Sequence, residues 1–347
     1  MRALVIHAPH DLRLEAVPTA PLGPHDVLVR IAAGGICGSD LHYFHHGGFG
    51  TVRLKEPMVL GHEVAGTIAA VGAGVTRVAP GDKVAVNPSA PCSHCRYCRM
   101  GLRNQCLDMR FYGSAMRFPH VQGAFREEMV VPEGQAVKMA AGVDIALAAM
   151  CEPFAVALHA VAQAGDLAGR RVLVSGCGPI GCLVIIAARR AAAAEIVATD
   201  IAPAALAIAG EVGAGRLVDV SAGTAELADL AADKGQVDVV FECSGNPQAI
   251  AGAIEVARPG GTIVTVGLGG DVPLPMNAIV AKELLLRGSF RFDSEFDLAA
   301  RLVSQGSVDL SPLLTATFPV EEAGAAFAHA SDRSRAMKVQ IRFGDDF

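Results

Sequence analysis

The first part of the chain, up to about residue 150, consists of short apolar runs separated by glycine and proline. Examples are VLVRIAA (27–33), VAGTIAAVG (64–72) and DKVAV (82–86). Runs of this length that are rich in β-branched residues and bounded by turn-forming residues are typical of strands. This part is therefore predicted to be mostly β.

From about residue 170 to 290, apolar runs alternate with Ala-rich stretches of helical length. The predicted strands are RVLVSG, EIVATD, RLVDV, DVVFECSG and GTIVTVG, with helices ending near 190 and spanning 204–212 and 248–257. This alternation predicts βαβ units, a parallel sheet and helices on both faces. ELLLRGSF (283–290) is a further predicted strand. The tail continues with a helical pattern and the strand MKVQIRF, and we expect it to pack on the first part.

The composition indicates a folded protein with two cores. The 347 residues are 52% hydrophobic and 18% charged, and single cores stop growing beyond roughly 250–300 residues. The net charge of -6, with 29 Lys and Arg against 35 acidic residues, opposes binding to nucleic acid.

Two stretches could be taken for a signal peptide or a membrane span, and neither fits the pattern. The start MRALVIHAPHDLR has too short an apolar run for a signal peptide, and the uncharged stretch 172–188 is interrupted by glycine and proline. The nine cysteines, an odd number, favour a reducing compartment, where disulfides do not persist. We therefore expect a cytoplasmic protein with no membrane partner.

A glycine fingerprint follows the predicted strand RVLVSG. Gly176, Gly178 and Gly181 form G-x-G-x-x-G, with Pro179 and Ile180 between the last two glycines. Such a turn brings backbone N–H groups and a helix N-terminus to a pyrophosphate. In the alternative interpretation, these glycines only form a turn.

Asp200 ends the next predicted strand, where a carboxylate can bind the ribose of a dinucleotide. No arginine adjoins Asp200 to hold a 2′-phosphate, so the pattern favours NAD, with NADP possible. The alternative role for Asp200 is that of a helix N-cap.

Four of the nine cysteines lie within fifteen residues. Cys92, Cys95, Cys98 and Cys106 form C-x2-C-x2-C-x7-C, which can wrap one tetrahedral zinc ion. The alternative is a set of unconnected thiols. Because four thiolates close the coordination shell, this zinc is expected to be structural, and the chemistry should lie elsewhere.

Two further stretches carry metal-ligating residue types: GGICGSDLHYFHHG, with Cys37, and VLGHEVAG, with His62 and Glu63. With these stretches, with GHEVAGTIAAVG and GDKVAV, and with the cysteine loop, the chain resembles the zinc-dependent medium-chain alcohol dehydrogenase family over essentially its whole length. The resemblance implies an α/β protein: a GroES-like, mostly-β catalytic domain at 1–152, completed by 291–347, and a Rossmann NAD-binding domain at 153–290.

The resemblance also implies a catalytic zinc bound by Cys37, His62 and a third residue. In the polyol dehydrogenase branch the third ligand is a glutamate in an E-P motif, here Glu152 in CEPFAVALHA. Glu63 either binds the same zinc or orients it, and the sequence leaves open which carboxylate binds at rest. An open fourth position would bind an alcohol oxygen and lower its pKa.

The family pattern implies a proton relay after Cys37. Ser39 matches the relay hydroxyl, and His42 matches the base that receives the proton through the cofactor ribose. Otherwise Ser39 is a turn residue and His42 is merely exposed. Tyr43 matches a substrate-contact tyrosine of the polyol branch, with packing as its alternative role.

The longest matches indicate the substrate class. NPSAPCSHCRYC, NQCLDMRFYGSAMRFPHV, SGCGPIGCL and KELLLRGSFRFDSEF look like the L-idonate 5-dehydrogenases of this branch. They imply a sugar acid, interconverted between L-idonate and 5-keto-D-gluconate, whose carboxylate needs a cation. Arg291 is the first candidate, followed by Arg117 and His120.

Other functions remain open at this point. Sorbitol or xylitol dehydrogenase and L-threonine 3-dehydrogenase are alternatives within the family. A zinc-ribbon nucleic-acid-binding protein is a remote alternative that the net charge opposes. The family resemblance also implies a homo-oligomer, either a dimer or a tetramer.

Overall fold

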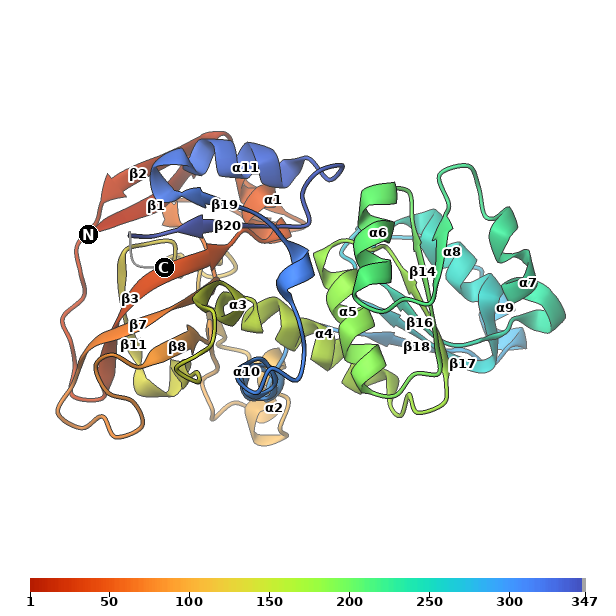
Figure 1. Ribbon diagram of the computed structural model, residues 1–347, viewed down its shortest axis with the longest axis horizontal. Helices are drawn as coiled ribbons and strands as arrows, with labels where there is room; N and C mark the ends of the chain where they lie inside the picture. The colour runs from red at the N-terminus through yellow and green to blue at the C-terminus, as the bar shows by residue number, and fades with distance from the viewer. Residues whose placement is uncertain (345–347) are drawn as a thin grey trace. The chain divides into compact units, whose positions relative to one another are not determined.

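The computed structural model describes residues 1–344 and divides into two compact units (Figure 1). Unit 1 comprises Met1–Glu152, Phe296–Asp332 and the chain from Lys338, and unit 2 comprises Pro153–Glu295 and Arg333–Met337. The second division therefore lies after Glu295, beyond the residue 290 expected from the sequence.

Glu295, the last residue of this part of unit 2, accepts a hydrogen bond on its carboxylate from His159 of the same unit over 3.0 Å. Burial opposes ionisation of Glu295, but this bond and backbone N–H groups outweigh it and lower the pKa of Glu295 to about 2.

Unit 1 is built mainly on antiparallel strands. The strands are β1 (Arg2–Ala8), β2 (Asp11–Ala16), β3 (Asp26–Gly35), β4 (Gly48–Phe49), β5 (Val52–Arg53), β6 (Met58–Val59), β7 (Glu63–Val71), β8 (Lys83–Val86), β9 (Ser89–Ala90), β10 (Arg110–Phe111), β11 (Glu128–Pro132), β12 (Ala136–Lys138), β19 (Leu314–Pro319) and β20 (Lys338–Arg342). The main sheet has the order β12-β8-β7-β3-β20-β19, and β11 also pairs with β3.

The helices of unit 1 lie around these strands. They are α1 (Gly38–His46), α2 (Arg96–Arg99), α3 (Ile145–Ala149), α10 (Glu295–Ser304, of which Glu295 belongs to unit 2) and α11 (Ala323–Ser331). The predicted strands at 27–33, 64–72 and 82–86 are confirmed as β3, β7 and β8. The tail also packs on this part as expected, since β20 pairs with β3 inside the sheet.

Unit 2 contains a six-stranded parallel sheet. Its strands are β13 (Arg171–Ser175), β14 (Glu195–Asp200), β15 (Arg216–Asp219), β16 (Val237–Glu242), β17 (Ala257–Thr265) and β18 (Leu285–Gly288), and its helices are α4 (Cys151–Ala164, whose first two residues belong to unit 1), α5 (Pro179–Arg190), α6 (Pro203–Glu211), α7 (Ala228–Ala231), α8 (Pro247–Val256) and α9 (Met276–Ala281).

The strand order in unit 2 is β15-β14-β13-β16-β17-β18. Figure 1 shows α5 and α6 on one face of this sheet and α8 and α9 on the other. The chain moves outward in one direction from β13 and in the other from β16, which is the doubly wound Rossmann arrangement. Each strand predicted for this part is confirmed.

The turn between β13 and α5 requires two of its three glycines. Gly176 has a φ of +88°, in the left-handed region, and a Cβ on Gly181 would overlap the carbonyl oxygen of Gly176. Pro179 occupies the first turn of α5, where its missing N–H leaves no helical hydrogen bond unmade. The helix N-terminus therefore packs directly against the end of β13.

Among the helices of residues 1–344, none is both long enough and apolar enough to cross a bilayer.

Candidate functional site

Three predicted metal ligands come together in unit 1. Ligand atoms of Cys37, His62 and Glu63 all lie within 4.8 Å of one another. Cys37 lies between the end of β3 and the start of α1, while His62 and Glu63 lie where the chain enters β7. A thiolate, an imidazole and a carboxylate form a donor set that suits zinc.

Asp40 joins the two segments that carry these ligands. Its side chain is fully buried and accepts hydrogen bonds from the N–H of Cys37 over 3.0 Å and from the N–H of Gly61 over 3.1 Å. Burial raises the pKa of Asp40. Asp40 was not predicted from the sequence, although its position three residues after Cys37 matches the spacing of a capping box.

The ring of His62 fits a metal ligand. Its Nδ1 atom is buried, has no hydrogen-bond partner among the described residues and lies 3.9 Å from Asp40 Oδ1. A buried polar atom without a partner is unfavourable. Metal-bound imidazoles usually direct their second nitrogen to a carboxylate or carbonyl, and Asp40 lies close enough to serve after a small movement.

Glu152, at the start of α4, lies close enough to interact electrostatically with the three ligands. Its carboxylate oxygens are not within 4.8 Å of the ligand atoms of all three. Burial, together with the charges of Glu63 and Cys37, raises the pKa of Glu152 to about 8. Burial, followed by the charge of Glu63, likewise raises the pKa of Cys37 to about 12. A divalent cation favours the deprotonated forms of such groups, so the charge distribution also fits a metal site.

Lys338 is a second residue that the sequence analysis missed. It lies on β20, and its Nζ is 2.8 Å and 2.7 Å from the two carboxylate oxygens of Glu63. A lysine within an apolar strand gives no sequence signal that it points inward. Its partner is 275 residues away along the chain.

The cysteine loop forms a second, separate cluster. Sulfur atoms of Cys92, Cys95, Cys98 and Cys106 lie within 4.8 Å of one another, on a segment bracketed by the paired strands β9 and β10. The backbone N–H of Cys92 points to Cys106 Sγ over 3.1 Å.

The surroundings of the thiols in this loop differ. Hydrogen bonds from the backbone N–H groups of Cys98 and Leu107 lower the pKa of Cys95 to about 6, whereas burial raises that of Cys98 to about 12. All nine cysteines are described and none forms a disulfide. Four thiol ligands in one loop fit a closed zinc site.

Arg117 and His120 bond to their own segment and its neighbours. Arg117 donates hydrogen bonds to the carbonyl oxygens of Leu107 and Met109 and pairs with Asp108 over 2.9 Å. His120 Nε2 accepts the N–H of Lys55, so its Nδ1 carries the proton donated to the carbonyl of Arg117.

Both ring nitrogens of His120 are therefore engaged, and the guanidinium of Arg117 holds the segment after Cys106. The substrate roles expected for Arg117 and His120 stay predictions, and either role would require these contacts to change.

Helix α1 carries the other side chains predicted near the metal. Ser39 lies in its first turn, and His42 is exposed, with its ring centroid 5.8 Å from that of Phe49. Tyr43 is buried, and its hydroxyl oxygen accepts the N–H of Ala115 over 2.9 Å. The packing role considered for Tyr43 fits this contact.

The candidate cofactor crevice lies at the carboxyl ends of β13 and β16, where the strand order reverses. Asp200 Oδ2 accepts the N–H of Cys177 within the glycine turn over 2.6 Å, and Oδ1 accepts the N–H of Ala202. The carboxylate is therefore fixed against the turn, and the residues that follow it, 201–205, include no base.

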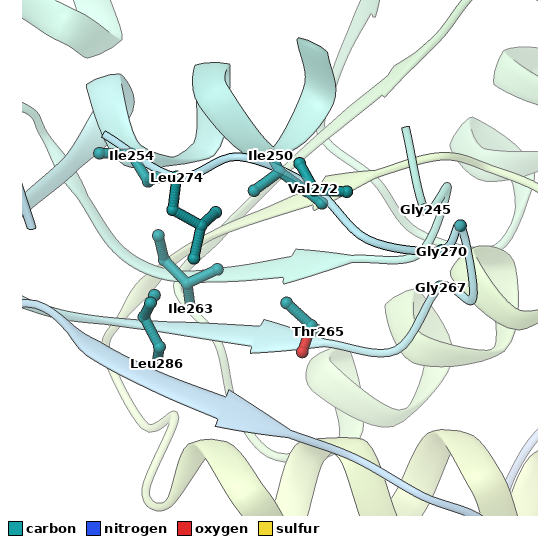
Figure 2. A pocket seen from close by; sticks show the side chains of 11 residues that line it. Gly245, Ile250, Ile254, Ile263, Thr265, Gly267, Gly270, Val272, Leu274 and Leu286 are labelled. Carbon is teal, nitrogen blue, oxygen red and sulfur yellow. The ribbon is translucent and has the colours of Figure 1, made fainter. Parts of the chain in front are cut away.

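A cavity of about 230 Å³ lies in unit 2 between α8, β17 and the loop after β17 (Figure 2). Its lining is aliphatic, with glycine backbone and the Thr265 hydroxyl at one end, and it contains no titratable or metal-ligating side chain. The chemistry must therefore be carried by other residues.

Comparisons with known proteins agree with both parts of the fold. Residues 23–141 match the alcohol dehydrogenase GroES-like domain, and residues 179–305 match the zinc-binding dehydrogenase family. The predicted pairing of a GroES-like domain with a Rossmann domain is confirmed. The matches also favour an oxidoreductase over a zinc-ribbon regulator.

Individual relatives cover nearly the whole chain. L-idonate 5-dehydrogenase (NAD(P)(+)) of Escherichia coli K12 is 45% identical over 317 residues, covering 91% of each chain. The crystal structure of the Escherichia coli L-idonate 5-dehydrogenase superposes with a TM-score of 0.94 at 42% identity, covering 99% of this chain and 98% of that one. Human sorbitol dehydrogenase is 36% identical over 337 residues, covering 94% and 91%. The chain therefore belongs to the zinc-dependent, NAD(P)-linked family of medium-chain alcohol dehydrogenases.

Proposed function

We propose that this protein interconverts a secondary alcohol and a ketone of a sugar acid, with L-idonate and 5-keto-D-gluconate as its substrates. The observation that carries the proposal is 45% identity to an L-idonate 5-dehydrogenase across 91% of the chain. The cluster of Cys37, His62 and Glu63 provides the donor set that this reaction needs.

The bound cofactors would supply the central chemistry: zinc lowers the pKa of an alcohol, and NAD accepts its hydride. Cys37, His62 and Glu63 would hold the zinc, with Glu152 beside them as a second carboxylate. Asp40 would keep the segments that carry Cys37 and His62 together through its two backbone hydrogen bonds.

The cofactor would bind at the turn of Gly176, Gly178 and Gly181, with Pro179 and Ile180 opening the helix behind it. Asp200 would accept hydrogen bonds from the adenosine ribose. Its negative charge disfavours a 2′-phosphate, so we propose NAD as the preferred cofactor.

Proton release is assigned to α1. Ser39 follows the ligand Cys37 by two residues, and His42 is exposed one turn further along the helix. An exposed imidazole can accept a proton and pass it to water.

Arg291 remains the proposed partner of the substrate carboxylate. It follows β18 at the carboxyl edge of the sheet, with a φ of +55° that is uncommon for a residue with a side chain. Such backbone conformations cluster at functional sites. Its guanidinium lies 5.0 Å from the ring centroid of Phe290, within the range of a cation–π contact.

The alternative substrate is a neutral polyol such as sorbitol or xylitol. Identity of 36% to human sorbitol dehydrogenase supports this alternative less strongly than 45% supports the sugar acid. L-Threonine is a third substrate to test.

We further propose that Cys92, Cys95, Cys98 and Cys106 hold a structural zinc ion, since their sulfur atoms lie within 4.8 Å of one another. We also propose that the protein is cytoplasmic.

The open edge of the parallel sheet supports a homo-oligomer. Among the described residues, β18 pairs only with β17, so one edge of the strand is open. Leu285 and Leu286 on this strand are 52% and 41% exposed. A second copy can pair with this edge about a two-fold axis.

The substrate assignment predicts a clear order of kcat/KM values. The kcat/KM for NAD reduction with L-idonate should exceed that with sorbitol, xylitol or L-threonine by at least about tenfold. A neutral polyol has no carboxylate, so the cation that binds this group in L-idonate would be left without a partner. Initial rates, with 5-keto-D-gluconate reduction measured for NADH and NADPH, check this. Faster turnover of a neutral polyol would reject the sugar acid.

Replacing Arg291 by Ala should lower kcat/KM for L-idonate by about tenfold or more, chiefly through KM, since a hydrogen bond to a charged group contributes about 1.5–3 kcal/mol. Steady-state kinetics of Arg291→Ala against Arg190→Ala, an exposed arginine at the end of α5, measure the effect. An equal loss for sorbitol, or a rise confined to KM for NAD, would reject the carboxylate role.

Leu285→Lys should weaken self-association, because it places a charge on the open edge of β18. Light scattering should show a wild-type mass that is a multiple of 35.8 kDa and a smaller mass for the variant. Leu217→Lys is the matched control, since Leu217 is 42% exposed on β15 at the opposite edge of the same sheet. An unchanged mass for Leu285→Lys would exclude this edge.

A further inference from the structure

Lys338 is a buried cation paired with the carboxylate of Glu63. Its side chain is 3% exposed, and that of Glu63 is 1% exposed. Its Nζ lies 2.8 Å and 2.7 Å from the two oxygens of Glu63, and 3.3 Å from the carbonyl oxygen of Ile36. Because both side chains are buried, losing one partner would leave the other as an uncompensated buried charge.

The pair spans a strand. Glu63 opens β7 and lies opposite Gly35 of β3, while β20 runs along the other side of β3, with Gln340 opposite the same glycine. The carboxylate of Glu63 must therefore pass over Gly35 to meet Lys338. A Cβ at position 35 would overlap Glu63 Oε2, so only glycine leaves room for this crossing.

The same carboxylate belongs to the metal cluster. Its oxygen lies within 4.8 Å of Cys37 and His62 ligand atoms while both oxygens remain within hydrogen-bond distance of Lys338. A carboxylate can accept from an ammonium group and still offer a lone pair to a metal.

We propose that Lys338 is a positioning residue for the catalytic metal. By donating hydrogen bonds to Glu63 across Gly35, it keeps this carboxylate within reach of the metal bound by Cys37 and His62. The inference rests on the proposed function in that the cluster binds zinc. It does not depend on which alcohol is the substrate.

The direct test is zinc retention by Lys338→Met. The full chain is dialysed against a series of chelator concentrations, and zinc per chain is measured by atomic absorption. The ion at the four cysteines serves as the internal reference. Removing a residue that orients a metal ligand typically weakens metal binding by about 10–100-fold. Lys338→Met should therefore lose one of two zinc ions at a chelator concentration at least about tenfold lower than wild type.

Four comparisons separate positioning from a general loss of stability. Lys338→Arg keeps the charge and should retain zinc better than Lys338→Met. Gly35→Ala keeps the lysine but displaces the carboxylate, and it should lose the same ion. Lys338→Met combined with Glu63→Gln should lose zinc no more readily than Glu63→Gln alone. Lys138→Met removes an exposed lysine that pairs with Asp82 over 2.7 Å, and it should have no effect.

The outcomes distinguish this inference from the proposed function. Two zinc ions in the wild type with unchanged retention in Lys338→Met and Gly35→Ala would overturn the role of Lys338 alone. Additive zinc loss in the double variant would also overturn it. One zinc ion in the wild type would overturn both this inference and the catalytic metal site. Two ions with the predicted losses but no turnover of L-idonate would sustain the role of Lys338 and reject the substrate.

Discussion

The pairing of β3 with β7 on one side and β20 on the other is the constraint on which the metal cluster depends. It places Glu63 and Gln340 opposite the same glycine and so brings the last described strand of the chain beside residues near its start. Cys37 lies just after β3, and His62 precedes β7. The register of these strands therefore fixes the positions of Cys37, His62 and Glu63, and that of Lys338 beside them. The tail adds Lys338 to this cluster through the pairing of β20 with β3, so a residue from the end of the described chain contacts a ligand near its start.

The two units supply different chemistry because their sheets differ. A parallel sheet brings strand ends and helix N-termini to one edge, where backbone N–H groups can bind a dinucleotide. The antiparallel sheet of unit 1 instead brings turns and strand starts from distant segments together, and so concentrates side-chain ligands. Fixed carboxylates recur in both: Asp40 joins two metal-binding segments, and Asp200 holds the glycine turn.

Features with short-range causes could be predicted from the sequence. The glycine turn and the cysteine loop each lie within a few residues, so spacing alone indicates their ligands. Cys37 and His62 needed the family resemblance, since their proximity depends on strand pairing. Lys338 could not be predicted, because nothing local indicates which face of β20 is buried against Glu63. The contacts of Arg117 and His120 depend on the path of their loop, which no local pattern indicates.

The central claim is that the chain holds two zinc ions, one of them at Cys37, His62 and Glu63. The most direct measurement is anomalous diffraction at the zinc absorption edge from crystals of the full chain. The account predicts two peaks per chain, one among the four clustered cysteines and one bordered by Cys37, His62 and Glu63, with Lys338 still contacting Glu63. A single peak, at the four cysteines, would contradict it.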